Sequence, residues 1–153
     1  MPAPIEVSLR PVADEDLSAF WAHQQSNRPE AATPVQREAF MARWRRILDD
    51  PNAPIRTIAA SGQVVGYVAH FQRKNLPEVS YELGRPHWGH GFATAALRQF
   101  LRDIHVRPIY ARAAKDNAAS VRVLEKCGFA VVAEDRFTDA SGQEREEFVF
   151  ELR

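Results

Sequence analysis

The stretch ELGRPHWGHGFATAALRQFLRDI, from Glu82 to Ile104, decides the fold of this 153-residue chain. Gly84 ends an extended run, and Gly89 and Gly91 flank His90 just before apolar residues begin to recur. The stretch therefore predicts the end of a strand, a glycine-bearing loop and an amphipathic helix. The apolar residues that mark one face of this helix are Ala93, Leu97, Phe100, Leu101 and Ile104.

The glycine-bearing loop is a candidate phosphate site. Glycines before a helix leave backbone N–H groups free at the positive end of the helix dipole, where phosphate binds. A tight turn between strand and helix would explain the same glycines. A Walker loop would place Lys and Ser/Thr after Gly91, where this chain has Phe92 and Ala93. A dinucleotide fingerprint would need its third glycine at the position of Thr94.

The loop resembles the cofactor loop of the GNAT superfamily, the acetyl-CoA-dependent N-acetyltransferases. The family pattern Q/R-x-x-G-x-G/A falls on Trp88, Gly91 and Ala93. The segment HWGHGFATAAL is most similar to the branch that includes ribosomal-protein N-terminal acetyltransferases. A second block, NAASVRVLEKCGF from Asn117 to Phe129, resembles a later motif of the same family. Two motifs in the right order make the resemblance more specific than either motif alone.

Length and composition predict one soluble domain, residues 1–153, in the cytoplasm. Apolar residues make up 45% and charged residues 26%, as in ordinary globular proteins. Twenty basic residues balance twenty acidic ones, so no overall field favours nucleic acid or an anionic membrane. We expect no membrane span and no secretory signal, because neither apolar pattern is present. The single cysteine, Cys127, excludes an internal disulfide and fits a reducing compartment.

The remaining periodicities predict the order β α α β β β α β α β β. This is an α/β (α+β) fold with a mixed, mostly antiparallel sheet flanked by helices, and it is also the order of the GNAT fold. Asp14 is the expected cap of the first helix, and Thr33 and Gln36 form a capping box for the second. The expected strands are Glu6–Arg10, Ile55–Ala60, Val64–Phe71, Val79–Leu83, Ile109–Ala114, Phe129–Phe137 and Glu147–Leu152, with loops or turns at Ser26–Ala32, Asp49–Pro54, Ser61–Gly62, Lys74–Pro77 and Asp139–Gly142.

The resemblance implies acetyl-CoA as the co-substrate. In the GNAT fold the strands Val79–Leu83 and Ile109–Ala114 splay apart, and backbone around Leu83 would hold the pantetheine arm and donate to the thioester oxygen. Trp88 stands where the family often has Gln or Arg, so its contact would be through backbone unless it is a core anchor. No metal is expected, because histidines and cysteine show no ligand spacing. The residues expected to face the pyrophosphate are Trp88, Gly89, His90, Gly91, Phe92, Ala93 and Thr94, unless His90 is only solvated.

Glu82 is the expected general base. Tyr81 and Leu83 share one face of their strand, so Glu82 points to the other face, beside the gap. An ammonium group with a pKa of about 10.4 must lose a proton before it can attack the thioester. The alternative is a half-solvated carboxylate with no role in catalysis. Two weaker candidates for the base are Glu78, just before the same strand, and His70, on the expected strand Val64–Phe71.

The general acid is harder to assign. The tyrosine that many GNAT enzymes use falls on Leu124, which cannot donate a proton. By resemblance to branches with Asn-x-x-Ser, Asn117 would bind the pantetheine arm and Ser120 the sulfur. Both residues would also serve as an ordinary helix cap and first turn. Cys127, next to Gly128, is expected to be an inert thiol.

The sequence therefore predicts an N-acetyltransferase that works by direct attack of a primary amine in a ternary complex. No serine or cysteine lies in a motif with a base, which disfavours an acyl-enzyme. The alternatives are a degenerate GNAT domain that senses acyl-CoA, favoured by Leu124, and a nucleotide binder outside the family. A protein N-terminus and a small-molecule amine both remain open as acceptor, and a homodimer is compatible with the sequence. The acceptor site is expected among Asp14–Asp49, Gln72–Glu78 and the last hairpin.

Overall fold

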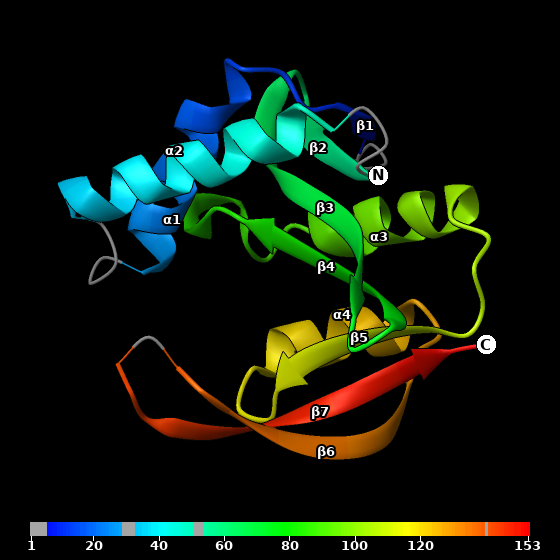
Figure 1. Ribbon diagram of the computed structural model, residues 1–153. Coiled ribbons are helices and arrows are strands. Elements are labelled where there is room, and N and C mark those ends of the chain that lie inside the picture. Colours follow the sequence, from blue (N-terminus) through cyan, green and yellow to red (C-terminus); the bar gives the residue numbers. More distant parts are fainter. Residues whose placement is uncertain (1–5, 29–32, 51–53, 140) are drawn as a thin grey trace.

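The computed structural model describes residues 6–28, 33–50, 54–139 and 141–153. Within these ranges seven strands form one sheet in the order β1-β2-β3-β4-β5-β7-β6 (Figure 1). The predicted order of elements is confirmed, with one added 3-10 turn, η2. The elements are β1 (Val7–Pro11), α1 (Asp16–Asn27), α2 (Pro34–Leu48), β2 (Ile55–Ala60), β3 (Gln63–Arg73), β4 (Leu76–Leu83), η2 (Arg85–His87), α3 (Phe92–Asp103), β5 (Ile109–Ala114), α4 (Ala118–Lys126), β6 (Ala130–Thr138) and β7 (Glu144–Leu152).

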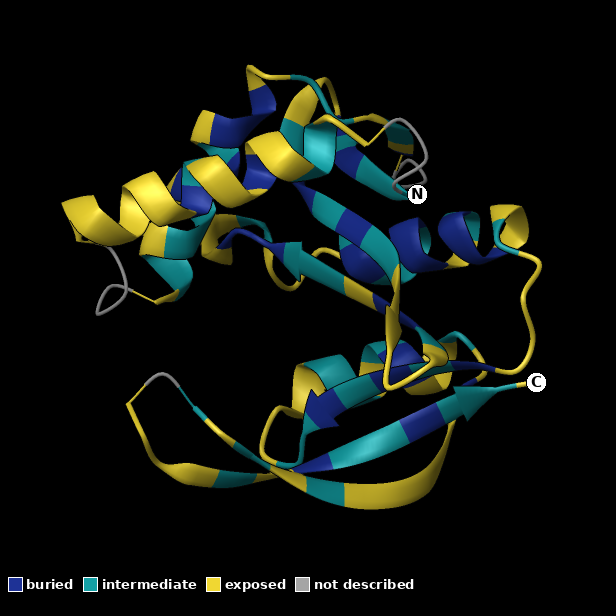
Figure 2. Cartoon of the chain, viewed as in Figure 1, coloured by how far each residue is buried: buried dark blue, intermediate teal, exposed yellow. Residues whose placement is uncertain are grey.

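Two helical layers cover opposite faces of the sheet. Tyr67 of β3 packs against an aromatic cluster from α1 and α2, whereas its neighbour Val68 belongs to the core cluster under α3. Because successive strand residues point to opposite faces, the two clusters lie on the two sides of the sheet. Helix α2 exposes most of its surface and buries only Phe40 and Trp44 (Figure 2). Helix α3 buries a continuous face of Ala93, Ala96, Leu97, Phe100 and Leu101. The predicted face is thus confirmed except at Ile104, which follows the helix and is partly buried, and Ala96 joins it.

The sheet is split between β4 and β5. These strands are parallel, and within the described residues they pair only where Glu78 meets Tyr110. Every other pair of neighbouring strands is antiparallel and paired over five or more positions. From the single contact the two strands diverge toward their carboxyl ends, as Figure 1 shows. The splaying that the family resemblance implied is therefore present.

Several boundaries differ from the sequence prediction. Helix α1 begins at Asp16, and its first flanking residue is Glu15 without a side-chain cap, so the cap predicted at Asp14 is wrong. The predicted loop Gln72–Glu78 shrinks to a turn at Lys74 and Asn75, because β3 and β4 both extend into it. The capping box at Thr33 is confirmed. The predicted loop Ser26–Ala32 begins two residues late, since α1 includes Asn27, and residues 29–32, 51–53 and 140 of the predicted loops lie outside the described residues.

The start of α1 is held by the buried carboxylate of Asp16, which bonds two near neighbours and one residue of a distant strand. Its carboxylate is 2% exposed and accepts two bonds of 2.7 Å from Arg10, one of 2.8 Å from Ala13 N–H and one of 2.8 Å from the Thr57 hydroxyl. Burial acts to raise the pKa of this carboxyl, but the hydrogen bonds outweigh burial and lower the pKa below its ordinary value. The contact ties the start of α1 to β1 and β2.

We expect Asp16→Asn to lower the free energy of unfolding by about 2–3 kcal/mol at neutral pH, because it leaves buried donors poorly matched. The carboxyl has a lower pKa in the folded chain than in the unfolded chain. Its contribution is therefore complete above the unfolded pKa of about 3.9 and is lost as the pH falls through the folded value. Denaturant titrations at pH 7 and pH 3 should show the deficit shrinking at the lower pH. Asp14→Asn is the control, and an equal deficit in that variant would contradict the assignment.

Candidate active site

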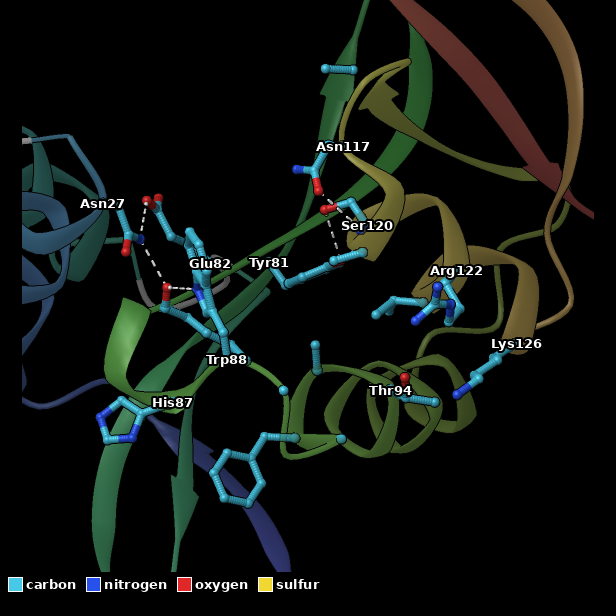
Figure 3. A pocket seen from close by; sticks show the side chains of 18 of the residues that line it. Asn27, Tyr81, Glu82, His87, Trp88, Thr94, Asn117, Ser120, Arg122 and Lys126 are labelled. Carbon is cyan, nitrogen blue, oxygen red and sulfur yellow. Dashed lines mark hydrogen bonds between the residues drawn. The ribbon is translucent and has the colours of Figure 1, made fainter.

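A cavity of about 720 Å³ lies where β4 and β5 diverge. Its walls come from the end of α1, the end of β4, the loop before α3, the first turn of α3 and one side of α4 (Figure 3). Most of the residues predicted for the site are among its lining. These are Glu82, Leu83, Trp88, Gly89, Gly91, Phe92, Ala93, Thr94, Asn117 and Ser120.

One end of the cavity is built to receive an anion. Gly91 precedes α3 with a left-handed φ of 79° and provides no side-chain cap. The first backbone bond of the helix runs from Ala95 N–H to Gly91 C=O, so the N–H groups of the preceding turn belong to the unsatisfied end of the helix. Arg122 and Lys126 of α4 line the same cavity. A positive helix end and two cations together fit the diphosphate of coenzyme A.

The free end of β4 directs backbone groups into the opening. Gly84 N–H donates to Val65 C=O of β3 at 3.1 Å. Because backbone groups of successive strand residues point to opposite edges, those of Leu83 face away from β3. The Leu83 carbonyl accepts from Asn27 Nδ2 at 2.8 Å and from Trp88 Nε1 at 2.9 Å (Figure 3). The Leu83 N–H therefore points away from β3, toward the split, where the family resemblance predicts a donor to the thioester oxygen.

Trp88 and His90 differ from their expected contacts. The Trp88 indole is 51% exposed, so it is not a core anchor, and it acts through its ring N–H on the Leu83 carbonyl. The Arg85 guanidinium lies 5.2 Å from the centre of the Trp88 ring. His90 is exposed, stacks on Phe92 at 5.4 Å and is not among the residues that line the cavity.

Glu82 lies on the opposite side of β4 from Tyr81, as its alternation predicted. Its carboxylate accepts hydrogen bonds from Arg28 at 2.6 Å, Asn27 at 3.2 Å and the Tyr67 hydroxyl at 3.3 Å. Burial raises the pKa of Tyr67, so its phenol keeps the proton that it donates to Glu82. Three donors leave about one of four lone-pair positions for a water or an amine.

The weaker base candidates lie elsewhere. Glu78 does not line the cavity; it is 4% exposed and lies 3.4 Å from Arg112, and burial raises its pKa. His70 lines a second hollow of about 540 Å³ beside α2, and burial lowers its pKa. The structure instead brings His87 to the main cavity, edge-on to His23 at 5.4 Å. Burial and then the neighbouring His87 lower the pKa of His23.

The α4 wall of the cavity, where the general acid is expected, contains two hydroxyl groups. Leu124 is 2% exposed in the core and presents nothing to the cavity. Asn117 caps α4 by accepting from Ser120 N–H at 3.2 Å, so the predicted cap is confirmed. The Tyr81 hydroxyl donates to Ser120 Oγ at 3.2 Å, and both residues line the cavity. Cys127 is half-buried outside the lining, and burial raises the pKa of its thiol.

Sequence reasoning placed Tyr81 on the correct face but missed its contact with Ser120, which is 39 residues away. It also missed Asn27, His87 and the basic residues of α4. The alternation of β4 is the one sequence feature that points to this contact. It places the Tyr81 hydroxyl on the core side of the strand, where a hydroxyl needs a hydrogen-bond partner. No local pattern points to Asn27, because its partners lie 55 and 56 residues away.

A split sheet, an uncapped helix end facing the split and a carboxylate beside it define the architecture of a GNAT-type acetyltransferase. The sequence profile described as "Acetyltransferase (GNAT) domain" matches residues 6–130. The chain therefore belongs to the GNAT acetyltransferase family. An uncharacterized N-acetyltransferase, p20, from Bacillus licheniformis is 31% identical over an alignment of 62 positions that covers 38% of this chain. The match spans 35% of the length of that relative, about a third.

Solved structures of acetyltransferases share the fold. The ribosomal-protein-alanine N-acetyltransferase of Brucella melitensis superposes with a TM-score of 0.76 at 21% identity, covering 95% of this chain and 98% of that one. A putative acetyltransferase from Salmonella typhimurium, solved with its cofactor acetyl-CoA, gives 0.73 at 19%, covering 96% and 93%. The microcin C7 self-immunity acetyltransferase MccE, in complex with acetyl-CoA and AMP, gives 0.78 at 15%, covering 96% and 92%.

Two kinds of feature are absent from the parts of the chain that the structure describes. No described helix has both the length and the apolar character that crossing a membrane requires. No group of three or more His, Cys, Asp or Glu side chains in these ranges is arranged to hold a metal ion.

We expect Gly89→Ala to weaken coenzyme A binding several-fold, and Gly62→Ala to leave it unchanged. Both glycines have left-handed φ values, 80° and 77°, and an added Cβ meets no atom within 4 Å at either position. The two variants should therefore lose similar stability, about 1–2 kcal/mol, from backbone strain. Only Gly89 lines the cavity, where a methyl group would occupy ligand space. Calorimetric titration with coenzyme A measures the difference, and equal affinities would remove Gly89 from the anion site.

Proposed function

We propose that residues 1–153 form one acetyltransferase domain that moves the acetyl group of acetyl-CoA to a primary amine in a ternary complex. One observation carries the proposal: a single cavity joins the uncapped end of α3 to the Glu82 carboxylate. The first is suited to a diphosphate and the second to an ammonium group. The divergence of β4 and β5 provides the passage between them.

The phosphate end would be held by the first-turn N–H groups of α3 with Arg122 and Lys126. Asn117 uses its side-chain oxygen for the α4 cap, and its amide N–H groups remain to donate to the pantetheine arm. The Leu83 N–H would donate to the thioester oxygen, where negative charge develops during attack. A donor fixed in place by its strand stabilises that charge without reorganisation.

Glu82 would accept the proton that the amine loses when its nitrogen bonds to the acetyl carbon. Arg28 and Asn27 fix the direction of the carboxylate, and Tyr67 holds its second oxygen. One lone-pair position is then left to accept the proton, directly or through one water. Because Glu82 lies on the α1 and α2 side of the sheet, the acceptor would enter from that side. A protein N-terminus and a small-molecule amine both fit this description.

A catalytically inactive acyl-CoA sensor is the second candidate function. It is favoured by the burial of Leu124, since the usual tyrosine is absent from α4. Release of free thiol from acetyl-CoA, measured with a panel of amines, distinguishes the two functions. Thiol release that depends on an added amine supports the transferase, whereas tight coenzyme A binding without release on any amine supports the sensor.

On a responsive acceptor, we expect Glu82→Gln to lower kcat about 100-fold near pH 7, because the ammonium group then lacks a base. The defect should shrink toward pH 9, where more of the amine is already neutral. The KM for acetyl-CoA should change by less than about threefold, since Glu82 lies away from the phosphate end. Glu125→Gln, an exposed carboxylate of α4 outside the cavity, is the control. A Glu82→Gln rate equal to that of the parent protein between about pH 6 and pH 9 would contradict the assignment.

A further inference from the structure

Tyr81 reaches from β4 across the opening of the sheet to α4. Its ring packs against the core cluster beneath α3, and its hydroxyl lies 3.2 Å from Ser120 Oγ (Figure 3). We propose that Tyr81 and Ser120 form a two-hydroxyl proton relay that protonates the departing thiolate, with Ser120 next to the sulfur. The inference rests on the proposed acetyl transfer and identifies its missing acid.

The relay occupies the place left by Leu124. Ser120 lies one helical turn before Leu124 on α4, and Val123 between them also lines the cavity. Leu124 turns into the core, so the helix itself offers no phenol. Tyr81 delivers a phenol to the same region from the facing strand. The proton donor that α4 lacks is thus supplied by β4.

The two hydroxyls have complementary hydrogen-bonding capacity. A serine hydroxyl has one proton and two lone pairs, so Ser120 can accept from Tyr81 and still donate to another atom. Asn117 fixes the first turn of α4 by accepting from Ser120 N–H, which sets the position of Oγ. Burial raises the pKa of Tyr81, and the hydrogen bond with Ser120 lowers it by a smaller amount. The phenol is therefore protonated throughout the neutral pH range.

The proton transfers balance. When the carbon–sulfur bond breaks, the electron pair stays on sulfur and Ser120 donates its hydroxyl proton to it. Tyr81 then donates its proton to Ser120, and solvent returns a proton to the phenolate. Glu82, on the opposite face of β4, releases the amine proton to solvent, so each turnover leaves both groups as they began. Cys127 is no substitute donor, because its thiol lies 3.8 Å from the Thr94 carbonyl, outside the cavity lining.

Tyr81→Phe keeps the ring and removes only the hydroxyl. We expect kcat to fall about 10- to 100-fold, with the KM for acetyl-CoA unchanged within about threefold. Ser120→Ala should cause a similar loss, and the double variant should lose little more than either single one, because a relay acts as a unit. Tyr110→Phe is the control, since Tyr110 lies on β5 outside the cavity and should keep the parental rate. Thermal unfolding shows whether each variant folds. If Tyr81→Phe does not fold, the activity of Ser120→Ala tests the relay.

A selenoester donor separates a proton relay from a structural role. The selenolate of acetyl-seleno-coenzyme A is a much weaker base than a thiolate, so it leaves without a proton. The Tyr81→Phe defect should disappear with this donor and persist with acetyl-CoA. An equal defect with both donors, or a parental rate for Tyr81→Phe and Ser120→Ala, would overturn the relay. If the parent protein binds coenzyme A but releases no thiol with any amine of the panel, the proposed function itself fails.

Discussion

The site depends on how the backbone hydrogen-bonding groups at the open end of β4 find partners. A strand that leaves its neighbour exposes carbonyl groups, and a buried carbonyl without a donor costs free energy. Here Asn27 from α1 and Trp88 from the loop both donate to the Leu83 carbonyl, in place of a strand partner. The opening therefore remains free of a paired strand. The two donors also connect α1 and the cofactor loop to the point where β4 ends, so the acceptor side and the cofactor side share one anchor.

The closed end of the split is held by charge. Arg112 of β5 lies 3.4 Å from Glu78 of β4, 2.8 Å from Glu147 of β7 and 2.9 Å from Asp135 of β6. A guanidinium that is 16% exposed requires such partners, because an unpaired buried charge is strongly destabilising. These contacts cluster beside the single paired position of β4 and β5. The sheet is thus fastened at one end by ion pairs, and at the other end two side-chain donors satisfy the Leu83 carbonyl, which has no strand partner.

The sequence predicted what local patterns control. Gly89, Gly91 and the apolar stripe of α3 set the loop and the helix, and the alternation of β4 placed Tyr81 and Glu82 on opposite faces. The parts that were missed depend on contacts between distant residues. Asp14 has the chemistry of a good cap, but α1 begins at Asp16, and no local pattern shows that the Asp16 carboxylate bonds Arg10 and Thr57. Nothing local in the sequence shows that the Trp88 indole reaches the Leu83 carbonyl, so the pattern predicts only a backbone contact or a core position for Trp88.

The register of β4 links these observations to the proposed chemistry. Adjacent strand residues point to opposite faces, so Glu82 and Tyr81 lie on the two sides of one peptide unit. Glu82 faces the α1 and α2 layer, where Tyr67 joins it, and Tyr81 faces the α3 and α4 layer, where Ser120 joins it. A base and an acid on opposite faces suit a reaction in which the amine enters from one side and the thiolate leaves on the other. A shift of one residue would exchange the two groups, so the pairing of β3 with β4, Tyr67 opposite Glu82, is what assigns each side its chemistry.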